Sequence, residues 1–212
     1  MKKIIILDFD GVFYSSVNQF KYVPEYINNH RKNFLPHLNQ TQYEMVCNQN
    51  PNFVKAISGQ DVAREIYVLK KKYPQFKIST KDFWNVQQQY IYNIFLDDAN
   101  LVDAKQIEKV CKKYTTYIVS NSSPNHIKFY MQKFGVNPRW FKRIYSNHFF
   151  DCEQTKKYYY NKIITKEEIC PNQAIVFGDS EKTDLVPARE LGMHTVLVKD
   201  ASQLYDLITK NV

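Results

Sequence analysis

Long apolar runs are missing from this sequence. No segment approaches the roughly 18 consecutive apolar residues that a transmembrane helix needs. The opening letters, MKKIIIL, are similar to the start of a signal peptide, but the apolar run is short and is interrupted by Asp8 and Asp10. We therefore expect a protein that has no membrane partner and stays in the cytoplasm.

Cysteine pairs with metal-binding spacing are also missing. The chain has four cysteines, and no two of them form a CxxC pair or a Cys/His cluster with zinc spacing. This argues against the common structural zinc sites, and it favours a reduced chain over a disulfide framework. The four are Cys47, Cys111, Cys152 and Cys170.

Concentrated positive charge is missing too, although the chain is basic overall. It carries 29 Lys and Arg against 21 Asp and Glu, a net charge of +8, but its longest basic run is KKK at 70–72. No finger, knuckle or RNP-type spacing accompanies these lysines, so we expect solvated surface charge and no nucleic-acid partner. With 212 residues, 44% of them hydrophobic, the chain suits one large domain or a core domain with a smaller insert.

The chain changes character twice along its length. Residues 3–9 contain a continuous apolar run with three β-branched isoleucines, which predicts a fully buried strand. From 17 to 98 apolar residues recur at helical spacing, as in GQDVAREIYVLKKKYP, and no strand pattern is convincing. From 99 onward helices and strands alternate. The sequence therefore predicts a core domain made of 1–16 and 99–212, with 17–98 as an all-helical insert.

The alternating part of the chain predicts an α/β fold. Helices are expected at 103–114, 124–135, 158–167, 184–192 and 202–210, and strands at 115–120, 143–146, 173–179 and 194–199. This rhythm indicates a Rossmann-like parallel sheet covered by helices on both faces. In such a sheet, ligands bind at the carboxyl ends of the strands.

Polar residues follow three of the predicted strands at the edge where a ligand would bind. They are Asp8 at the end of the first strand with Asp10 directly after it, Ser120 and Asn121 at the end of the strand at 115–120, and Asp179, followed by Asp184, at the end of the strand at 173–179. Each alone is typical of an ordinary turn or helix cap. Together, at one edge of one sheet, they predict a site built around carboxylates.

These residues, in this order, resemble the motifs of the haloacid dehalogenase-like (HAD) superfamily of hydrolases. The first motif is matched by DFDGV at 8–12, the second by Ser120 at the end of a hydrophobic strand, and the fourth by Gly178 and Asp179 followed by Asp184. The helical insert resembles the C1-type cap of the family. The resemblance covers most of the chain and implies a Rossmann-like core with that insert as its cap.

The third motif of the family leaves a choice between two lysines. The family places a lysine at the start of the helix before the fourth motif, and here that region reads EQTKKYYYNKII. Lys156 and Lys157 both fit, although neither precedes the proline that is common in the family, and Lys162 lies further into the helix. The resemblance implies that one of the first two, with Lys156 slightly favoured, offsets charge at the nucleophile and the phosphate.

The resemblance also implies a role for each residue. Asp8 is the nucleophile that becomes an aspartyl-phosphate, and Asp10 protonates the leaving group and then deprotonates water. Ser120, Asn121 and the motif lysine contact the phosphoryl group. Mg²⁺ is the implied cofactor, and its ligands are Asp8, the backbone carbonyl of Asp10, Asp179 and Asp184.

The implied function is a Mg²⁺-dependent phosphatase that acts on a small phosphorylated metabolite or nucleotide. Asp10 favours this reaction over dehalogenation, because a halide leaving group needs no proton and the true dehalogenases lack an acid at that position. A phosphosugar mutase of the same family remains open, and it would require a glucose bisphosphate for turnover. A catalytically silent homologue that binds a partner through its cap also remains open.

Overall fold

The computed structural model describes residues 3–15, 71, 100–122, 124–146 and 156–212. The chain divides into two units, one made of Met1–Ser15 with Asn100–Val212 and the other of Ser16–Ala99. Apart from Lys71, every described residue belongs to the first unit. The helical cap predicted at 17–98 therefore lies outside the described residues, and it stays a prediction.

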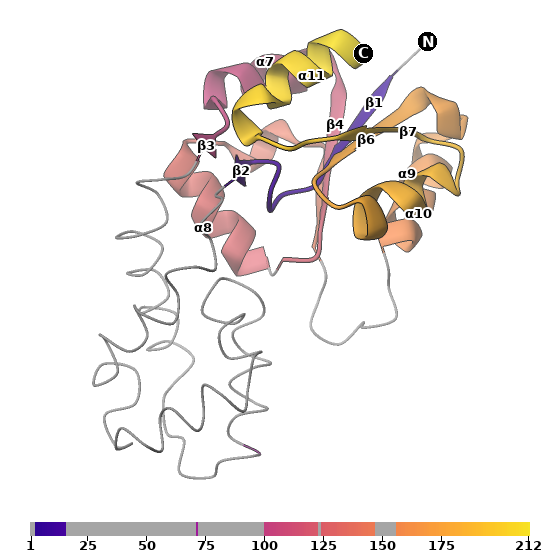
Figure 1. The fold of residues 1–212 in the computed structure, drawn as a ribbon, viewed down its shortest axis with the longest axis horizontal. Coiled ribbons are helices and arrows are strands. Elements are labelled where there is room, and N and C mark those ends of the chain that lie inside the picture. The colour runs from indigo at the N-terminus through magenta and orange to yellow at the C-terminus, as the bar shows by residue number, and fades with distance from the viewer. Residues whose placement is uncertain (1–2, 16–70, 72–99, 123, 147–155) are drawn as a thin grey trace. The chain divides into compact units, whose positions relative to one another are not determined.

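A five-stranded parallel sheet forms the centre of the first unit (Figure 1). Its strands are β1 (Ile4–Leu7), β4 (Thr115–Ser120), β5 (Arg143–Ser146), β6 (Ala174–Gly178) and β7 (His194–Leu197). Their order is β5-β4-β1-β6-β7, and every neighbouring pair is parallel. The chain builds outward from β1 first to one side and then to the other, which puts the topological switch point beside β1. The predicted Rossmann-like parallel sheet is confirmed.

One face of the sheet is covered by α9 (Lys156–Glu167), the π-helical turn η4 (Glu181–Leu185) and α10 (Val186–Arg189). Ile4 and Ile6 of β1 join a buried cluster here with Ile163 of α9 and Leu185 of η4, and none of the four is more than 1% exposed. Burying one such side chain stabilises the fold by about 1.5–3 kcal/mol. This face is therefore a large part of the core.

The other face is covered by α7 (Ala104–Lys113), α8 (Pro124–Phe134) and α11 (Leu204–Asn211). Figure 1 shows these three helices on one side of the sheet, with α9 and α10 on the other. Ile107 of α7, Met131 of α8 and Ile208 of α11 are all buried. Because helices cover both faces, all four residues of β1 are buried, which explains why the strand is apolar at every position.

A second, two-stranded sheet was not predicted from the sequence. In it β2 (Tyr14–Ser15) pairs antiparallel with β3 (Asn100–Leu101), and Ser15 lies opposite Asn100. A backbone hydrogen bond from Val102 N to Phe13 O, 3.0 Å long, continues this pairing. The chain therefore leaves the first unit after Ser15 and returns to it beside the same residue.

The helix ends follow ordinary capping chemistry. The Asp103 side chain accepts a hydrogen bond of 2.8 Å from the Lys105 backbone N–H at the start of α7. Pro124 begins α8, and Gly135, directly after that helix, adopts a left-handed φ of 69°. Helix α9 begins at Lys156, two residues before the predicted start. The single helix predicted after β6 is instead η4 followed by the short α10.

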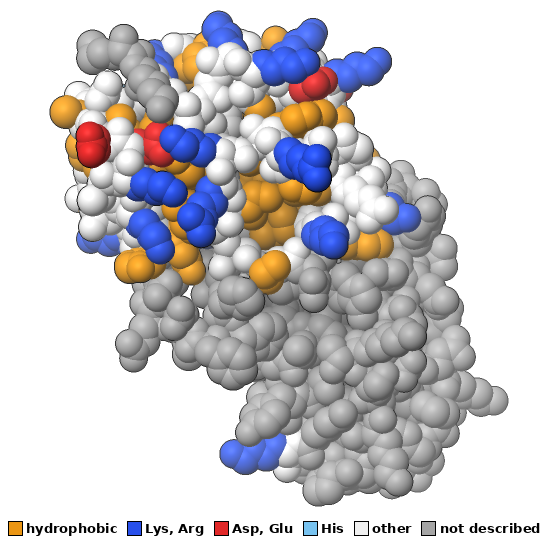
Figure 2. Space-filling model, turned by 180° about the vertical axis from the view of Figure 1, so that it is seen from behind, with side chains coloured by type: hydrophobic (Ala, Val, Ile, Leu, Met, Phe, Trp, Pro, Cys, Tyr) orange, Lys and Arg blue, Asp and Glu red, His pale blue; other side chains and the backbone are white. Residues whose placement is uncertain are grey.

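Lysine and arginine side chains are spread over the surface of the described core. Figure 2 shows them across one face, with apolar and uncharged side chains between them. Some are paired with acids, as Lys112 Nζ is with Glu108 Oε1 at 2.9 Å and Lys142 Nζ with Glu167 Oε1 at 2.7 Å. Among the described helices, none is both long enough and apolar enough to cross a membrane.

Candidate active site

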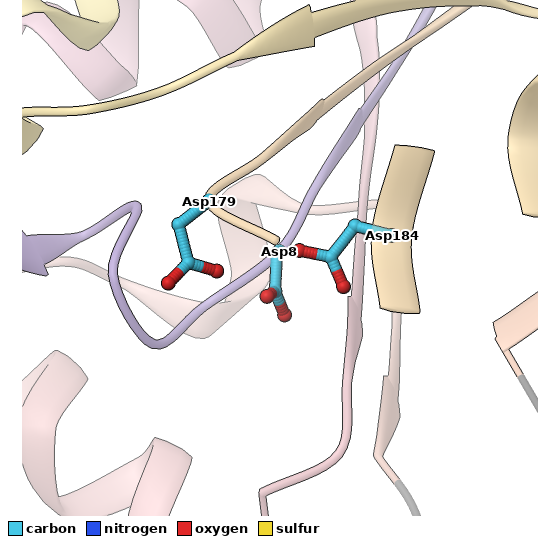
Figure 3. A group of neighbouring side chains, drawn as sticks. All are labelled: Asp8, Asp179 and Asp184. Atoms are coloured by element: carbon cyan, nitrogen blue, oxygen red, sulfur yellow. The ribbon is translucent and has the colours of Figure 1, made fainter. Parts of the chain in front are cut away.

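Three carboxylates meet at the carboxyl ends of the two central strands. Asp8 directly follows β1, Asp179 directly follows β6, and Asp184 lies in η4. One oxygen of each lies within 4.8 Å of the others, and Figure 3 shows the three side chains next to one another. Asp8 is 5% exposed and Asp184 is fully buried, whereas Asp179 is open to solvent. The predicted meeting of the strand-end acids is therefore present in the structure.

Two glycines allow this close approach of the acids. A Cβ atom at Gly178 would lie 2.5 Å from Cβ of Asp184, closer than real Cβ contacts come. A Cβ atom at Gly11 would overlap the Asp179 carboxylate, and the φ of 76° at Gly11 is itself a conformation that favours glycine. Any larger residue at either position would push the acids apart.

The η4 turn fixes the orientation of Asp184. Its Oδ2 accepts a hydrogen bond of 3.0 Å from the Ser180 backbone N–H, and its Oδ1 accepts one of 2.9 Å from the Thr183 hydroxyl. The Asp184 backbone N–H in turn donates to the Ser180 carbonyl at 3.0 Å. This turn carries a buried carboxylate back toward the end of β6, five positions after Asp179.

Lys156 is the cation of the site. Its side chain is 4% exposed, and its Nζ lies 2.8 Å from Asp8 Oδ1 and 2.5 Å from Asp184 Oδ1. Lys157 lies elsewhere, because its exposed Nζ is 2.6 Å from Glu190 Oε2. Successive residues of a helix point about 100° apart, so only one of two adjacent lysines can face the site. The structure thus brings Lys156 to the aspartates and does not bring Lys157.

Burial and charge change the pKa values of the site in different directions. Burial raises the pKa of Asp8 well above its usual value, and the Lys156 ammonium only partly offsets this. Burial alone would raise the pKa of Asp184, but the charge of the same ammonium, together with hydrogen bonds from Lys156, Ser180 and Thr183, outweighs it and holds that pKa below its usual value. Burial alone would lower the pKa of Lys156, but Asp8 and Asp184 outweigh it and raise that pKa. Lys156 therefore stays charged.

Asp179 carries the remaining negative charge of the site. Asp179 is exposed in part, and the partial burial of its carboxylate, followed by repulsion from Asp184, raises the pKa of Asp179 to about 6. Among the described residues, Lys156 supplies the one ammonium that lies against these carboxylates, which leaves an excess of negative charge when all three are ionised. Hard carboxylate oxygens with uncompensated charge are the ligands that Mg²⁺ prefers. The three aspartates therefore fit a magnesium site.

Asp10 lies two residues after Asp8 and has different partners. Its Oδ1 accepts a hydrogen bond from the Tyr14 hydroxyl, and its Oδ2 accepts one from the Ser122 hydroxyl. Burial, followed by the charge of Asp10, raises the pKa of Tyr14 well above its usual value, so this phenol remains protonated and able to donate. Asp10 itself is half-buried.

Ser120 ends β4 at the same edge of the sheet as Asp8. Leu7 of β1 lies opposite Ile118 of β4, so both strands deliver their last residues to this edge. The Ser120 side chain is 1% exposed, and its Oγ accepts a hydrogen bond of 3.0 Å from the Ser122 backbone N–H. Asn121, the next residue after Ser120, is exposed.

Residues 2–192 match the sequence profile of a family described as haloacid dehalogenase-like hydrolase. The chain belongs to this family. A search among curated proteins found no match. The family that the motifs at Asp8, Ser120 and Asp179 predicted is therefore confirmed, and the protein is a HAD-like hydrolase.

Solved structures share the fold of this HAD-like hydrolase. A predicted phosphoglycolate phosphatase from Haemophilus somnus aligns with a TM-score of 0.58 and 18% identity, over 92% of this chain and 84% of that chain. A HAD family enzyme from Bacteroides thetaiotaomicron, in complex with magnesium and inorganic phosphate, gives 0.55 and 16% over 93% and 94%. A 2-haloacid dehalogenase from Pseudomonas syringae gives 0.56 and 12% over 100% of both chains. Because a phosphatase and a dehalogenase both share the fold, the fold alone does not select the reaction.

Two residues of the HAD-like site were not predicted from the sequence. Tyr14 and Ser122 both contact Asp10, yet neither lies at a motif position that the sequence singled out. A weak signal existed for Ser122, which belongs to the polar run SNSS that begins at the last residue of β4. Tyr14 gave no signal, because its hydroxyl reaches Asp10 only after the chain has turned at Gly11.

Proposed function

We propose that this HAD-like hydrolase is a Mg²⁺-dependent phosphatase that hydrolyses a small phosphorylated metabolite through an aspartyl-phosphate on Asp8. The observation that carries the proposal is the buried contact of Lys156 with Asp8 and Asp184, beside Asp179, at the end of the central strand. In the proposed organisation, 1–16 and 99–212 form the catalytic core, and the insert between them is a helical cap that selects the substrate.

Asp8 is the nucleophile in this proposal. A carboxylate oxygen of Asp8 attacks the phosphorus atom, and the bond between phosphorus and the ester oxygen breaks. Lys156, 2.8 Å from Asp8 Oδ1, offsets the repulsion between an anionic nucleophile and an anionic substrate. Ser120 and Asn121 lie at the same sheet edge, and we assign them to the phosphoryl oxygens.

Asp10 transfers the protons. It gives a proton to the ester oxygen as that oxygen leaves, and the alcohol product departs. The Asp10 carboxylate then takes a proton from a water molecule, which attacks the phosphorus atom of the aspartyl-phosphate. Inorganic phosphate leaves, and both Asp8 and the protonated Asp10 are restored.

The proposed metal ligands are Asp8, the backbone carbonyl of Asp10, Asp179 and Asp184. When bound, Mg²⁺ supplies positive charge that favours the ionised form of these acids and offsets the charge of the phosphate. The Bacteroides neighbour in complex with magnesium and phosphate, and the Haemophilus neighbour described as a phosphatase, support this choice of ion and substrate class.

The experiment that tests the proposal is a panel of aryl and alkyl phosphates assayed with Mg²⁺ and with a chelator. We expect phosphate release that requires Mg²⁺ and is lost in Asp8→Asn, which keeps the shape of the side chain but removes its charge. Asp206→Asn is the matched control, because Asp206 is exposed on α11 and should leave turnover unchanged. No Mg²⁺-dependent turnover on any member of a broad panel would refute the proposal.

A further inference from the structure

Both carboxylate oxygens of Asp10 accept hydrogen bonds from buried hydroxyl groups. Tyr14 OH donates to Oδ1, and Ser122 Oγ donates to Oδ2. The two donors come from different parts of the fold, since Tyr14 lies in β2 and Ser122 follows β4. Tyr14 is 1% exposed and Ser122 is 4% exposed, so both residues are shielded from bulk water.

Tyr14 is held rigidly in place. The backbone N–H of Phe13 donates to the Phe9 carbonyl at 2.9 Å, which closes the turn that follows β1. The Tyr14 ring stacks on the Tyr130 ring of α8 with a centroid distance of 4.7 Å and an interplanar angle of 10°. It also meets the Phe9 ring edge-on at 6.1 Å. Such aromatic packing leaves the phenol one direction in which to point.

Ser122 is held by the end of β4. Its backbone N–H donates to Ser120 Oγ at 3.0 Å, which bends the chain directly after the strand. The bend turns the Ser122 hydroxyl toward Asp10, while Ser120 stays in the strand that neighbours β1. The two serines are thus coupled, and Ser122 links the candidate phosphate-binding strand end to the candidate proton-transfer group.

We propose that Tyr14 and Ser122 are positioning residues that orient Asp10 for proton transfer to the leaving group. This inference rests on the proposed phosphatase function. A hydroxyl can donate to an ionised carboxylate and can accept from a protonated one, so it suits a group that must alternately carry and release a proton. Asp8 contrasts with this, because its partner Lys156 is an ammonium, which can only donate.

The test compares two classes of substrate in Tyr14→Phe and in Ser122→Ala. The value of kcat/KM reports the steps up to the first irreversible one. In these steps an alkoxide leaving group needs a proton, whereas p-nitrophenolate does not. We expect kcat/KM to fall about tenfold on the alkyl phosphate that the wild type hydrolyses fastest, and less than twofold on p-nitrophenyl phosphate. Asp10→Asn should show the same selectivity with a loss of about 100-fold or more on the alkyl phosphate.

Two further variants separate positioning from folding. Ser122→Thr retains a hydroxyl and should recover most of the activity that Ser122→Ala loses on the alkyl phosphate. Tyr117→Phe is the matched control for Tyr14→Phe, because Tyr117 is equally buried and donates to Glu167 rather than to a residue of the site. Its ratio of alkyl to aryl activity should equal that of the wild type.

Equal losses on both substrates, or no loss on either, would overturn the positioning role while leaving the phosphatase function intact. If Tyr14→Phe does not fold, the comparison of Ser122→Ala with Ser122→Thr tests the positioning role by itself. A wild type that hydrolyses p-nitrophenyl phosphate but no alkyl phosphate would overturn proton delivery by Asp10. A wild type with no activity at all would instead remove the proposed function.

Discussion

Replacing Lys156 by methionine should strongly destabilise the metal-free protein. Methionine has a similar length but no charge, so Lys156→Met leaves Asp8 and Asp184 without the ammonium that lies 2.8 and 2.5 Å from them. Removing one partner of a buried ion pair typically costs about 3–5 kcal/mol, because the other charge stays buried without compensation. For a chain of this size each kcal/mol lowers Tm by about 2–4 °C, so we expect a loss of about 6–20 °C.

The assay is urea and thermal unfolding in the presence of a chelator, with Lys157→Met as the control. Lys157 is the adjacent residue, and its ion pair with Glu190 is exposed, with side chains 46% and 53% accessible. Exposed pairs of this kind contribute about 0–1 kcal/mol. The two variants therefore differ by one position in the sequence, and we expect their effects on the free energy of unfolding to differ several-fold.

Magnesium gives the same experiment a second readout. A divalent cation at the aspartates would replace part of the charge that Lys156→Met removes, so Mg²⁺ should raise the Tm of this variant more than that of the wild type. Equal destabilisation by Lys156→Met and Lys157→Met in the chelator would refute the assignment of Lys156 to the site. A smaller Mg²⁺ response in Lys156→Met than in the wild type would refute the charge argument.

Three further predictions follow from the acids, the glycines and one buried phenol. The pKa of Asp179 is raised to about 6, so its contribution to metal-free stability is complete below about pH 4 and is lost as pH rises through about 6. Mg²⁺ should therefore raise Tm more at about pH 7.5 than at about pH 5, and an equal rise at both pH values would contradict this. Gly178→Ala should lower the free energy of unfolding by about 1–3 kcal/mol and weaken the Mg²⁺ response, since its Cβ would lie 2.5 Å from Cβ of Asp184; a wild-type melting curve with an unchanged Mg²⁺ response would count against the close approach. Tyr145→Phe should leave stability unchanged or raise it by about 1 kcal/mol in urea unfolding, because the buried Tyr145 hydroxyl has no hydrogen-bond partner among the described residues; a marked loss would show that the hydroxyl is satisfied.

The strand-end acids could be predicted from the sequence because they depend on local pattern alone. The run IIIL can only be a buried strand or a short helix segment, and the acid that follows it, Asp8, is placed by the end of that run. The same reasoning holds for Ser120 after β4 and for Asp179 after β6. Parallel strands then bring these ends to one edge without any further information.

The sequence favoured Lys156 over Lys157 only slightly, because the choice depends on the rotation of α9 about its axis. Both lysines lie at the start of the helix, and a rotation of about 100° would exchange them. The rotation of α9 is determined by the residues that it packs against the sheet, and these include its buried residues Tyr159, Tyr160 and Ile163. In a run such as KKYYYNKII the apolar residues are too evenly spread to indicate the buried face.

The small sheet of β2 and β3 was missed for a different reason. Each strand has only two residues, and Ser15 pairs with Asn100, which lies far along the chain. A two-residue strand has no periodicity, and neither partner can be recognised without the other. The contact of Tyr14 with Asp10 depends on the same local fold, so it could not be predicted from the sequence either.

The two acids of the first motif differ because their side chains contact different elements of the fold. Asp8 meets Lys156 of α9 and lies near Asp184 of η4, and both of these elements cover one face. The chain then turns at Gly11, and Asp10 meets Tyr14, whose ring packs on α8 on the other face. Two carboxylates that are chemically identical in the sequence thus acquire an ammonium partner and hydroxyl partners respectively. In the proposed mechanism, the difference between the nucleophile Asp8 and the proton carrier Asp10 therefore follows from the partners that the end of β1 and the turn after it give to each acid.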